Sequence, residues 1–343
     1  MVLTETGYKS NITNLAGKIS SKDHMRILVF GKDGQLGRAF ESLFASLNLP
    51  PEVSIQSVGR KQCDLANGPA LIDLLTHSKA DLIINASAYT AVDKAETEVD
   101  LAFAINARAP EIMAEYAVKN GATFLHYSTD YVFDGEKYGF YLEDDVRNPL
   151  GVYGKSKAAG EAAIARVFAG SVIGRYAIFR TSWVYGDGGN FIRTILRLAK
   201  EREELKIIAD QYGVPTSADW LAQISLGFAL NERGELNSFP SGIYHAVPAG
   251  ETSWHGLAVS AVHAALEAGV ALKVTANAIK AIPAVEYPLP APRPMNSRMS
   301  TNKLQAILSR SSSYNEPLKP HKFPHWEVMV HEYIRKLASS GLI

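Results

Sequence analysis

A tyrosine and a lysine stand four residues apart in the stretch V-Y-G-K-S-K, at Tyr153 and Lys157. Residues at this spacing share one face of a helix, so the Lys157 ammonium could lie beside the Tyr153 phenol and favour its ionised form. Such a pair could exchange a proton with a reacting oxygen. The spacing alone is weak evidence, because a chain with 15 tyrosines contains about one such pair by chance. An exposed helix that carries a tyrosine and two lysines is the alternative, and the surrounding segments decide between them.

A glycine-rich stretch, G-K-D-G-Q-L-G, follows the apolar run R-I-L-V-F and places Gly31, Gly34 and Gly37 at three-residue spacing. In a turn from strand to helix, such glycines let the backbone approach a pyrophosphate, which the helix N-terminus binds through its N–H groups and dipole. A glycine-rich turn without a ligand is the alternative. Because the stretch directly follows a buried strand, as the motif requires, the sequence predicts dinucleotide binding.

The end of the second predicted strand indicates which dinucleotide is bound. The stretch V-S-I-Q-S-V-G-R-K has no acid for the ribose 2'-hydroxyl of NAD, but it offers Arg60 and Lys61, which suit the 2'-phosphate of NADPH. We therefore predict NADPH as the cofactor, with NADH as the second choice; solvated loop cations are the alternative. The carboxylate of Asp64 could accept a hydrogen bond from the adenine amino group.

Short apolar runs alternate with segments of helical period from Met25 onward. The expected strands are 26–30, 53–58, 81–86, 123–128 and 176–182, and the expected helices between the first four are 36–47, 68–77 and 98–118. This alternation is typical of βαβ units and of a parallel sheet with helices on both faces. The predicted fold class is therefore α/β, a Rossmann-type doubly wound parallel sheet.

The rest of the chain has a different pattern. Residues 1–24 show no clear period and are expected to be an N-terminal extension without regular structure, followed by a dinucleotide-binding domain at 25–185. The remainder, 186–343, is expected to be a smaller, loop-rich and mainly substrate-binding portion with some return to the sheet. It includes a helix near 190–202, a loop at 210–216 and, at 288–299, four prolines that exclude a helix or a central strand.

Polar residues follow two of the predicted strands. The stretch N-A-S-A-Y-T places Ala86 to Tyr89 at the carboxyl edge of the sheet, and H-Y-S-T-D places Ser128 to Asp130 at the same edge. Ligands of such folds bind at this edge. The helix with Tyr153 and Lys157 comes next, so three segments converge on one crevice. His126, inside a strand, is expected to be a core histidine rather than a catalyst.

Composition excludes several function classes. The 343 residues carry 35 basic and 35 acidic side chains, so no net field attracts nucleic acid. The single cysteine, Cys63, excludes an internal disulfide and fits a reducing compartment. No apolar run reaches the roughly 18 residues that span a membrane, and the polar N-terminal segment is not a secretory signal. We expect a cytoplasmic protein with a small-molecule substrate.

Six motifs together resemble the extended short-chain dehydrogenase/reductase superfamily and, within it, the dTDP-4-dehydrorhamnose reductase family. They are G-K-D-G-Q-L-G, N-A-S-A-Y-T-A-V-D-K-A-E, H-Y-S-T-D-Y-V-F-D-G, P-L-G-V-Y-G-K-S-K-A-A-G-E, R-T-S-W-V-Y-G and D-Q-Y-G-V-P-T. The resemblance extends from Met25 to about Glu327. It implies an enzyme that uses NADPH or NADH to reduce the C4 ketone of dTDP-4-dehydro-L-rhamnose to dTDP-L-rhamnose, a precursor of cell-surface polysaccharides.

The resemblance also implies roles for single residues. Tyr153 would protonate the developing alkoxide, Lys157 would hold the nicotinamide ribose and favour ionisation of Tyr153, and Thr129 would bond the sugar near C4. The implied substrate contacts are Asp130 and Trp183, and Arg293 could meet the diphosphate. Gly31, Gly37, Arg60 and the catalytic pair are already expected to contact the cofactor. The resemblance adds further cofactor contacts at Gly34, Gln35, Leu36, Asp64, Leu65, Ser87, Ala88, Tyr89 and Tyr127. Ordinary packing is the alternative for Trp183 and Tyr127, and a solvated side chain for Arg293.

Other functions known for related proteins of this fold fit the sequence less well. Sugar-nucleotide 4,6-dehydratases resemble this family but carry Thr-Asp-Glu where this chain has Thr129, Asp130 and Tyr131, so the base for removing a C5 proton is missing. A reductase for another nucleotide-linked keto sugar is one alternative. A non-catalytic regulatory subunit resembling the methionine adenosyltransferase beta subunit is the other.

The resemblance does not settle a metal or an oligomeric state. Some members of the family form a magnesium-linked dimer through glutamates, one of them in the phosphate-loop helix. In this chain that acid is displaced to Glu41, and only Glu327 matches the pattern. We therefore assign no metal residues, and magnesium and a homodimer both stay open.

Overall fold

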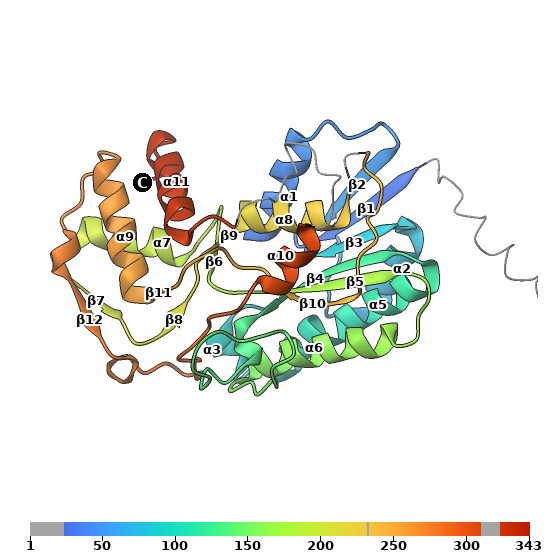
Figure 1. Ribbon diagram of the computed structural model, residues 1–343, viewed down its shortest axis with the longest axis horizontal. Helices are drawn as coiled ribbons and strands as arrows, with labels where there is room; N and C mark the ends of the chain where they lie inside the picture. The colour runs from blue at the N-terminus through green and yellow to red at the C-terminus, as the bar shows by residue number, and fades with distance from the viewer. Residues whose placement is uncertain (1–23, 232, 310–322) are drawn as a thin grey trace, which may run out of the picture.

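The computed structural model describes residues 24–231, 233–309 and 323–343, so the expected N-terminal extension lies outside the described residues except for His24. A six-stranded, all-parallel sheet forms the centre of the larger part of the molecule (Figure 1). Its strands, in spatial order, are β10 (Gly242–His245), β5 (Arg175–Thr181), β4 (Thr123–Thr129), β3 (Leu82–Asn85), β1 (Met25–Phe30) and β2 (Val53–Val58). The predicted α/β fold class is confirmed, because the chain order reverses beside β1 as in a doubly wound sheet.

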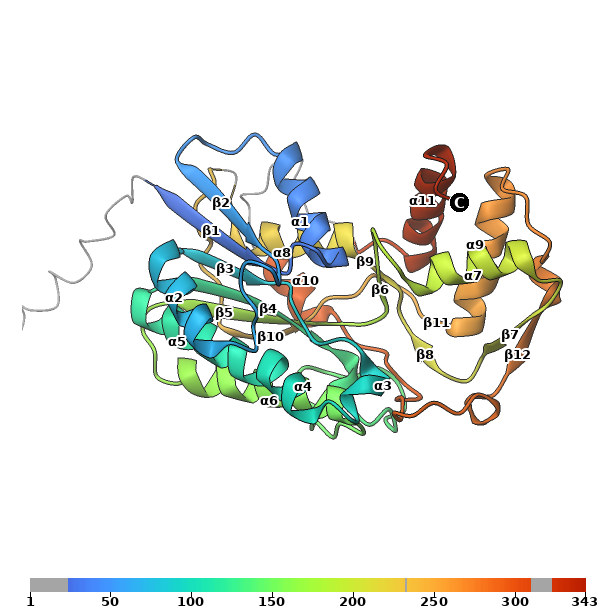
Figure 2. The ribbon, with the colours of Figure 1, turned by 180° about the vertical axis from the view of Figure 1, so that it is seen from behind.

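Helices cover both faces of this sheet (Figures 1 and 2). One face packs against α1 (Gln35–Ser46), α8 (Ala218–Ala229) and α10 (Asn302–Leu308). The other packs against α2 (Gly68–Ser78), α5 (Ala109–Asn120) and α6 (Val152–Phe168). Alternate residues of each strand point to opposite faces, so Ile27 and Val29 join the first cluster while Leu28 and Phe30 join the second.

The segment expected as one helix at 98–118 is instead made of three helical pieces. These are α4 (Val99–Phe103), a π-helical turn η1 (Ala104–Arg108) and α5, preceded by the short helix α3 (Val92–Ala95). A π turn holds one extra residue and is frequent at functional sites. Here it brings Asn106, 1% exposed, into contact with two other segments described below.

The remaining elements form a third apolar cluster beside the sheet. Its helices are α7 (Phe191–Glu201), α9 (Trp254–Glu267) and α11 (Trp326–Ser339), which lie together at one side of the molecule (Figure 2). Three two-stranded sheets join them: β7 (Leu205–Ile208) with β12 (Ile279–Ile282), β8 (Tyr212–Gly213) with β11 (Thr252–Ser253), and β6 (Val184–Tyr185) with β9 (Thr216–Ser217). The predicted loop at 210–216 therefore contains short strand pairings.

Three single 3-10 turns complete the described elements: η2 (Asp130–Val132), η3 (Ala276–Ala278) and η4 (Ala284–Glu286). The proline-rich 288–299 segment has neither helix nor strand, and it crosses back over the end of β4. Within the described ranges, no helix is both long enough and apolar enough to cross a lipid bilayer.

Candidate active site

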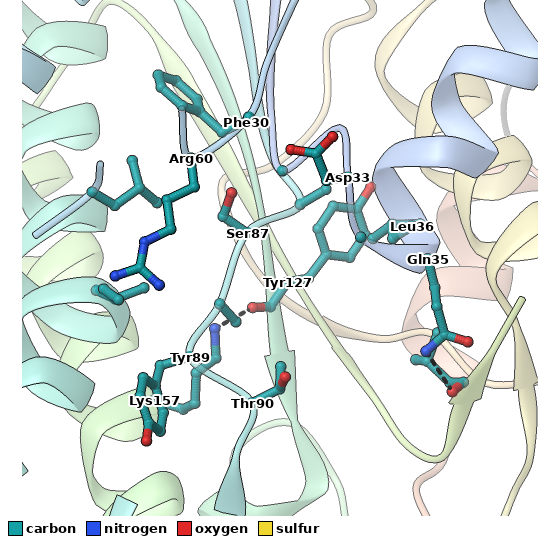
Figure 3. Close-up of a pocket in the computed structure, with 18 of the residues that line it drawn as sticks. Phe30, Asp33, Gln35, Leu36, Arg60, Ser87, Tyr89, Thr90, Tyr127 and Lys157 are labelled. Atoms are coloured by element: carbon teal, nitrogen blue, oxygen red, sulfur yellow. Dashed lines mark hydrogen bonds between the residues drawn. The ribbon is translucent and has the colours of Figure 1, made fainter. Parts of the chain in front are cut away.

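A pocket of about 500 Å³ opens at the carboxyl ends of β1, β3 and β4 (Figure 3). Most of the predicted cofactor residues line it: Gly31, Gly34, Gln35, Leu36, Arg60, Asp64, Leu65, Ser87, Ala88, Tyr89, Tyr127, Tyr153 and Lys157. Gly37 lies behind the lining, in the first turns of α1. The pocket also includes Asp33, Cys63, Ser128 and Thr181, which the sequence motifs do not assign to a cofactor.

The phosphate loop is shaped by two glycines. Gly31 has a φ of +91°, and a Cβ there would lie 2.7 Å from Ser87 Oγ. A Cβ on Gly37 would lie 2.0 Å from the Gly31 carbonyl oxygen, so only glycine lets α1 pack this close to the turn. Gly34 precedes α1 without any side-chain cap, and no acid occupies the first helical turn. The first N–H groups of α1 are therefore left for an anion.

Three buried polar atoms of the pocket lining make no hydrogen bond within the described chain: Gln35 Oε1, Ser128 Oγ and Thr181 Oγ1. An unsatisfied buried polar atom is costly, and natural proteins keep such atoms where a ligand or water satisfies them. A dinucleotide carries ribose hydroxyls and a carboxamide that can bond to these atoms. Together with the glycine turn, these atoms show that the pocket fits a dinucleotide.

The end of the pocket near β2 carries opposite charges. Arg60 and Asp64 form an ion pair at 3.6 Å, with side chains 72% and 43% exposed. The sequence shows no acid at the end of β2, but the phosphate loop brings one there: a Cβ on Gly59 would lie 2.1 Å from Asp33 Oδ2. A carboxylate that could accept from a ribose 2'-hydroxyl therefore stands near a cation that could bind a 2'-phosphate.

Helix α6 presents the predicted catalytic pair from its first two turns. Glu96 accepts a hydrogen bond from the Val152 N–H at 2.8 Å and so caps the helix start. Tyr153 follows directly, and its ring packs edge-on against Tyr131 with centroids 5.5 Å apart. Lys157 lies one turn further on and is 1% exposed. Lys155, two residues after Tyr153, is exposed.

Lys157 is held by β4 rather than by Tyr153. Its Nζ donates to the Tyr127 carbonyl oxygen at 2.6 Å, a contact drawn in Figure 3, and lies 3.2 Å from His126 Nε2. Burial lowers the pKa of Lys157 to about 8, although Glu161 acts in the opposite direction. The predicted core histidine, His126, is indeed buried, but it contacts the predicted catalytic lysine.

The phenol of Tyr153 is kept in its protonated form. Burial raises the pKa of Tyr153 to about 12, a hydrogen bond with Thr129 lowers it, and the charge of Asp130 raises it. We expected Lys157 to favour ionisation of this phenol, and in the protein alone the net shift has the opposite sign. The reason is that desolvation outweighs the other contributions.

Thr129 and Asp130 end β4 in a buried, hydrogen-bonded corner. Thr129 Oγ1 donates to Asp130 Oδ1 at 2.9 Å, and Ser297 Oγ donates to Asp130 Oδ2. Burial raises the pKa of Asp130 to about 6, while both hydrogen bonds lower it. Ser297 belongs to the proline-rich 288–299 segment, and no local pattern in the sequence indicates that this serine reaches the end of β4.

Like Thr129 and Asp130, the two other predicted substrate residues are not part of the pocket lining. Trp183 has a φ of +47°, rare for a large side chain, and its ring stacks on Trp254 with centroids 3.7 Å apart. Arg293 makes a two-pronged ion pair with Asp93, at 2.6 and 2.8 Å. Arg293 is therefore not a solvated side chain, and it also interacts with Tyr131, the neighbour of Tyr153.

A buried ion pair joins α6 to the sheet. Arg180 of β5 donates to Glu161 of α6 through Nε at 2.9 Å and through a terminal nitrogen at 2.7 Å. Both side chains are at most 1% exposed, and Arg147 contacts the same carboxylate at 3.3 Å. Because Glu161 is one turn beyond Lys157, this pair fixes the helix that carries the catalytic residues. Neither partner was predicted from the sequence.

The loop that carries Tyr89 is held by the π turn. Asn106 Oδ1 accepts from the Tyr89 N–H at 2.9 Å, and Asn106 Nδ2 donates to the Tyr89 carbonyl at 3.0 Å. The same nitrogen donates to Ser156 of α6 at 3.0 Å. One amide therefore ties the loop after β3 to the catalytic helix.

A doubly wound sheet, a glycine turn before α1 and a Tyr153–Lys157 pair at the strand ends define a dinucleotide-dependent oxidoreductase of the short-chain type. Comparison with known proteins narrows this class. The RmlD substrate binding domain model matches residues 25–322. The dTDP-4-dehydrorhamnose reductase of Escherichia coli K12 is 40% identical over 93% of this chain and 100% of its own length. The chain belongs to the dTDP-4-dehydrorhamnose reductase family.

Solved structures agree with this assignment. A dTDP-4-dehydrorhamnose reductase from Clostridium acetobutylicum has a TM-score of 0.77 and 32% identity, covering 91% of this chain and 99% of its own. The Bacillus anthracis enzyme, solved in complex with NADP, has a TM-score of 0.76 and 31% identity, with the same coverage. The family and fold expected from the motifs are both confirmed.

Proposed function

We propose that this protein reduces the C4 ketone of dTDP-4-dehydro-L-rhamnose to the alcohol of dTDP-L-rhamnose, with NADPH or NADH as the reductant, in the cytoplasm. The proposal is supported by the relatives, which carry this name over nearly the whole chain, and by the NADP bound to the Bacillus anthracis enzyme. The observation that carries it is the Tyr153–Lys157 pair in the same pocket as the phosphate loop.

The site residues have distinct tasks in this reaction. NADPH or NADH, when bound, supplies a hydride to C4 of the sugar. Tyr153 donates its proton to the oxygen on C4, and its raised pKa of about 12 keeps that proton in place at neutral pH. Lys157 orients the cofactor ribose beside the phenol, and Thr129 directs the C4 oxygen toward Tyr153. The chemistry needs one hydride and one proton, and no base for the C5 proton.

Asp130, Ser297 and Arg293 are proposed to position the substrate. Asp130 accepts from Ser297, so the proline-rich segment and the end of β4 form one wall beside the catalytic helix. Arg293 faces Tyr131 next to Tyr153 and could exchange its partner Asp93 for a diphosphate, which takes the same two-pronged contact. Trp183, stacked on Trp254, offers a flat apolar surface for a base or sugar.

The direct test is consumption of NADPH by the pure protein with dTDP-4-keto sugar generated in the same vessel. We expect NADPH oxidation that depends on the sugar and yields dTDP-rhamnose. Tight NADPH binding without any oxidation would overturn the proposal and favour a non-catalytic regulatory subunit. Oxidation with a UDP- or GDP-linked keto sugar, but none with the dTDP sugar, would show a reductase of different nucleotide specificity.

A further inference from the structure

A chain of four hydrogen-bonding groups lies beneath the Tyr153–Lys157 pair. The Ser87 N–H is 3.2 Å from Asn85 Oδ1, Asn85 Nδ2 is 3.1 Å from His126 Nδ1, and His126 Nε2 is 3.2 Å from Lys157 Nζ. Asn85 is fully buried, and His126 and Lys157 are each 1% exposed. Because Asn85 and His126 lie outside the pocket lining and have little access to water, their hydrogens must be satisfied within the chain itself.

The backbone decides in which direction the hydrogen bonds run. A peptide N–H can only donate, so the atom of Asn85 that faces Ser87 must be the carbonyl oxygen. The amide nitrogen of Asn85 then faces His126 Nδ1 and must donate to it. A donor at this place requires Nδ1 to be without a proton. The orientation of one backbone group thus fixes the orientation of the asparagine amide.

The same reasoning determines which ring nitrogen of His126 carries the proton. Burial, together with the nearby Lys157, lowers the pKa of His126 well below its usual value, so its ring is neutral. A neutral imidazole carries one proton, and with Nδ1 bare this proton sits on Nε2. His126 therefore points an N–H group at Lys157 Nζ. An ammonium has no lone pair to accept it, whereas a neutral amine has one.

Other groups around Lys157 act on the same equilibrium. On α6, Glu161 favours the ammonium, but Arg180 and Arg147 already pair with its carboxylate, and Tyr153 is neutral. On β4, Tyr127 supplies only its carbonyl oxygen to the lysine, since its phenol bonds Ser225 on the other face. The charged or titratable groups on the loops that share the pocket are Asp33, Arg60, Cys63, Asp64 and Tyr89. Of all these groups, His126 is the one that touches Nζ and favours its neutral form.

We propose that Asn85 and His126 are positioning residues that hold Lys157 ready to release a proton. In the reduction, Tyr153 gives its proton to the C4 oxygen and becomes a phenolate. The proton that restores the phenol comes from Nζ of Lys157, one helical turn away, so that the ammonium becomes an amine; Nζ itself contacts the Tyr127 carbonyl and His126. The N–H of His126 stabilises the amine that results. The catalytic part rests on the proposed function, while the tautomer of His126 does not depend on it.

The tautomer can be tested without any turnover. Nitrogen-15 NMR of the full chain, labelled in its nine histidines, distinguishes protonated from bare ring nitrogens, and the His126→Gln variant identifies the signals of His126. We expect Nε2 protonated and Nδ1 bare. In Asn85→Asp, the carboxylate can accept from both Ser87 and Nδ1, so the proton should move to Nδ1. A wild-type signal with Nδ1 protonated would overturn the proposal.

The consequence for Lys157 is tested by the pH dependence of kcat/KM. The wild-type rate should fall as the pH rises through the pKa of Lys157, about 8. In both Asn85→Asp and Asn85→Leu, His126 Nε2 can lose its proton and accept from the Lys157 ammonium. The fall of kcat/KM at high pH, here called the basic limb, should therefore move upward by about one pH unit in each variant. Aspartate adds a charge and leucine does not. A shift with aspartate alone would reveal a simple charge effect and overturn the tautomer mechanism.

A matched control and a second variant complete the experiment. Asn237→Asp makes the same chemical change at an amide that donates to the Gly227 and Phe228 carbonyls, outside the pocket, and should leave the basic limb unchanged. If Asn85→Leu does not fold, His126→Gln replaces it, because its carbonyl can accept from the ammonium without added charge. An unshifted limb in that variant would contradict the proposal. Wild type that shows the Nε2 tautomer but no turnover would refute the proposed function and leave the tautomer intact.

Discussion

The two ends of the pocket differ in how their polar side chains are held. At the catalytic end, Asn85, His126 and Lys157 are at most 1% exposed, and each has a bonded partner of fixed geometry. At the other end, Arg60 and Asp64 form an ion pair with a nitrogen–oxygen distance of 3.6 Å. Their side chains are 72% and 43% exposed. Proton transfer depends on sub-ångström placement, while recognition of a ribose or phosphate tolerates movable side chains.

This difference has a consequence for cofactor choice. Exposed ion pairs contribute about 0–1 kcal/mol, because solvent screens them and the side chains lose entropy on pairing. Arg60 and Asp33 also favour different cofactors, the first a 2'-phosphate and the second a 2'-hydroxyl. We therefore expect the chain to discriminate only weakly between NADPH and NADH, while its catalytic end tolerates almost no change.

The largest effect should come from Tyr153→Phe, which removes the proton donor and leaves the ring. General acid catalysis contributes about 10²–10⁴-fold, so kcat should fall by at least about a hundredfold. Binding of NADPH, measured by fluorescence titration, should stay close to wild type, because the phosphate loop is untouched. A rate near that of wild type would show that another group supplies the proton.

Arg180→Met tests the ion pair that anchors the catalytic helix. It leaves Glu161 buried without its main partner, and breaking such a pair costs about 3–5 kcal/mol of folding free energy. Chemical denaturation should show this loss. The double variant with Glu161→Met should recover most of it, since Arg147 is partly exposed and can be solvated. A single variant as stable as wild type would mean that α6 is held by its apolar face alone.

Asp130→Asn tests the buried corner at the end of β4. Asp130 has a pKa of about 6 in the folded protein, above its ordinary value of 3.8, so the folded state binds the proton more tightly than the unfolded state. This contribution to stability is fully present below about pH 4 and is lost as the pH rises through 6. The free energy of unfolding of wild type, relative to the variant, should fall by up to about 3 kcal/mol over this range. Parallel curves for the two proteins would contradict the raised pKa.

Arg60→Ala should have the smallest effect, at the exposed end of the pocket. The Kd for NADPH should rise by up to about tenfold, and that for NADH should change less, because only NADPH carries the 2'-phosphate. Asp33→Asn is the matched variant, and it should weaken the binding of NADH more than the binding of NADPH. Equal changes for both cofactors in both variants would remove these side chains from the basis of discrimination.

Much of the sheet could be predicted from the sequence, because its signals are local. The run Met25–Phe30 is apolar in all but Arg26, as a strand covered on both faces must be, and β1 begins at its first residue. The glycines at 31, 34 and 37 have a local steric role, so the phosphate loop could be located from the sequence alone. The proximity of Tyr153 and Lys157 could also be predicted, because residues four positions apart are neighbours on a helix.

The interactions that depend on distant residues could not be predicted. Ser297 reaches Asp130 from 167 positions along the chain, and Arg293 pairs with Asp93 from 200 positions away. Neither partner has a local pattern that distinguishes it from a solvated side chain. The net direction of the Tyr153 pKa shift could not be predicted for the same reason: spacing shows which cation is near, but not how much water the fold removes.

The π turn at Ala104–Arg108 limits how the chain length can vary near the site. Removing one residue there would convert the segment into an ordinary α-helix, with better backbone geometry and no break in the element. It would also rotate Asn106 by about 100° about the helix axis, away from Tyr89 and Ser156. We therefore expect that a one-residue deletion that leaves the helix intact would release the loop after β3 that carries Tyr89, so the site depends on the number of residues in this segment.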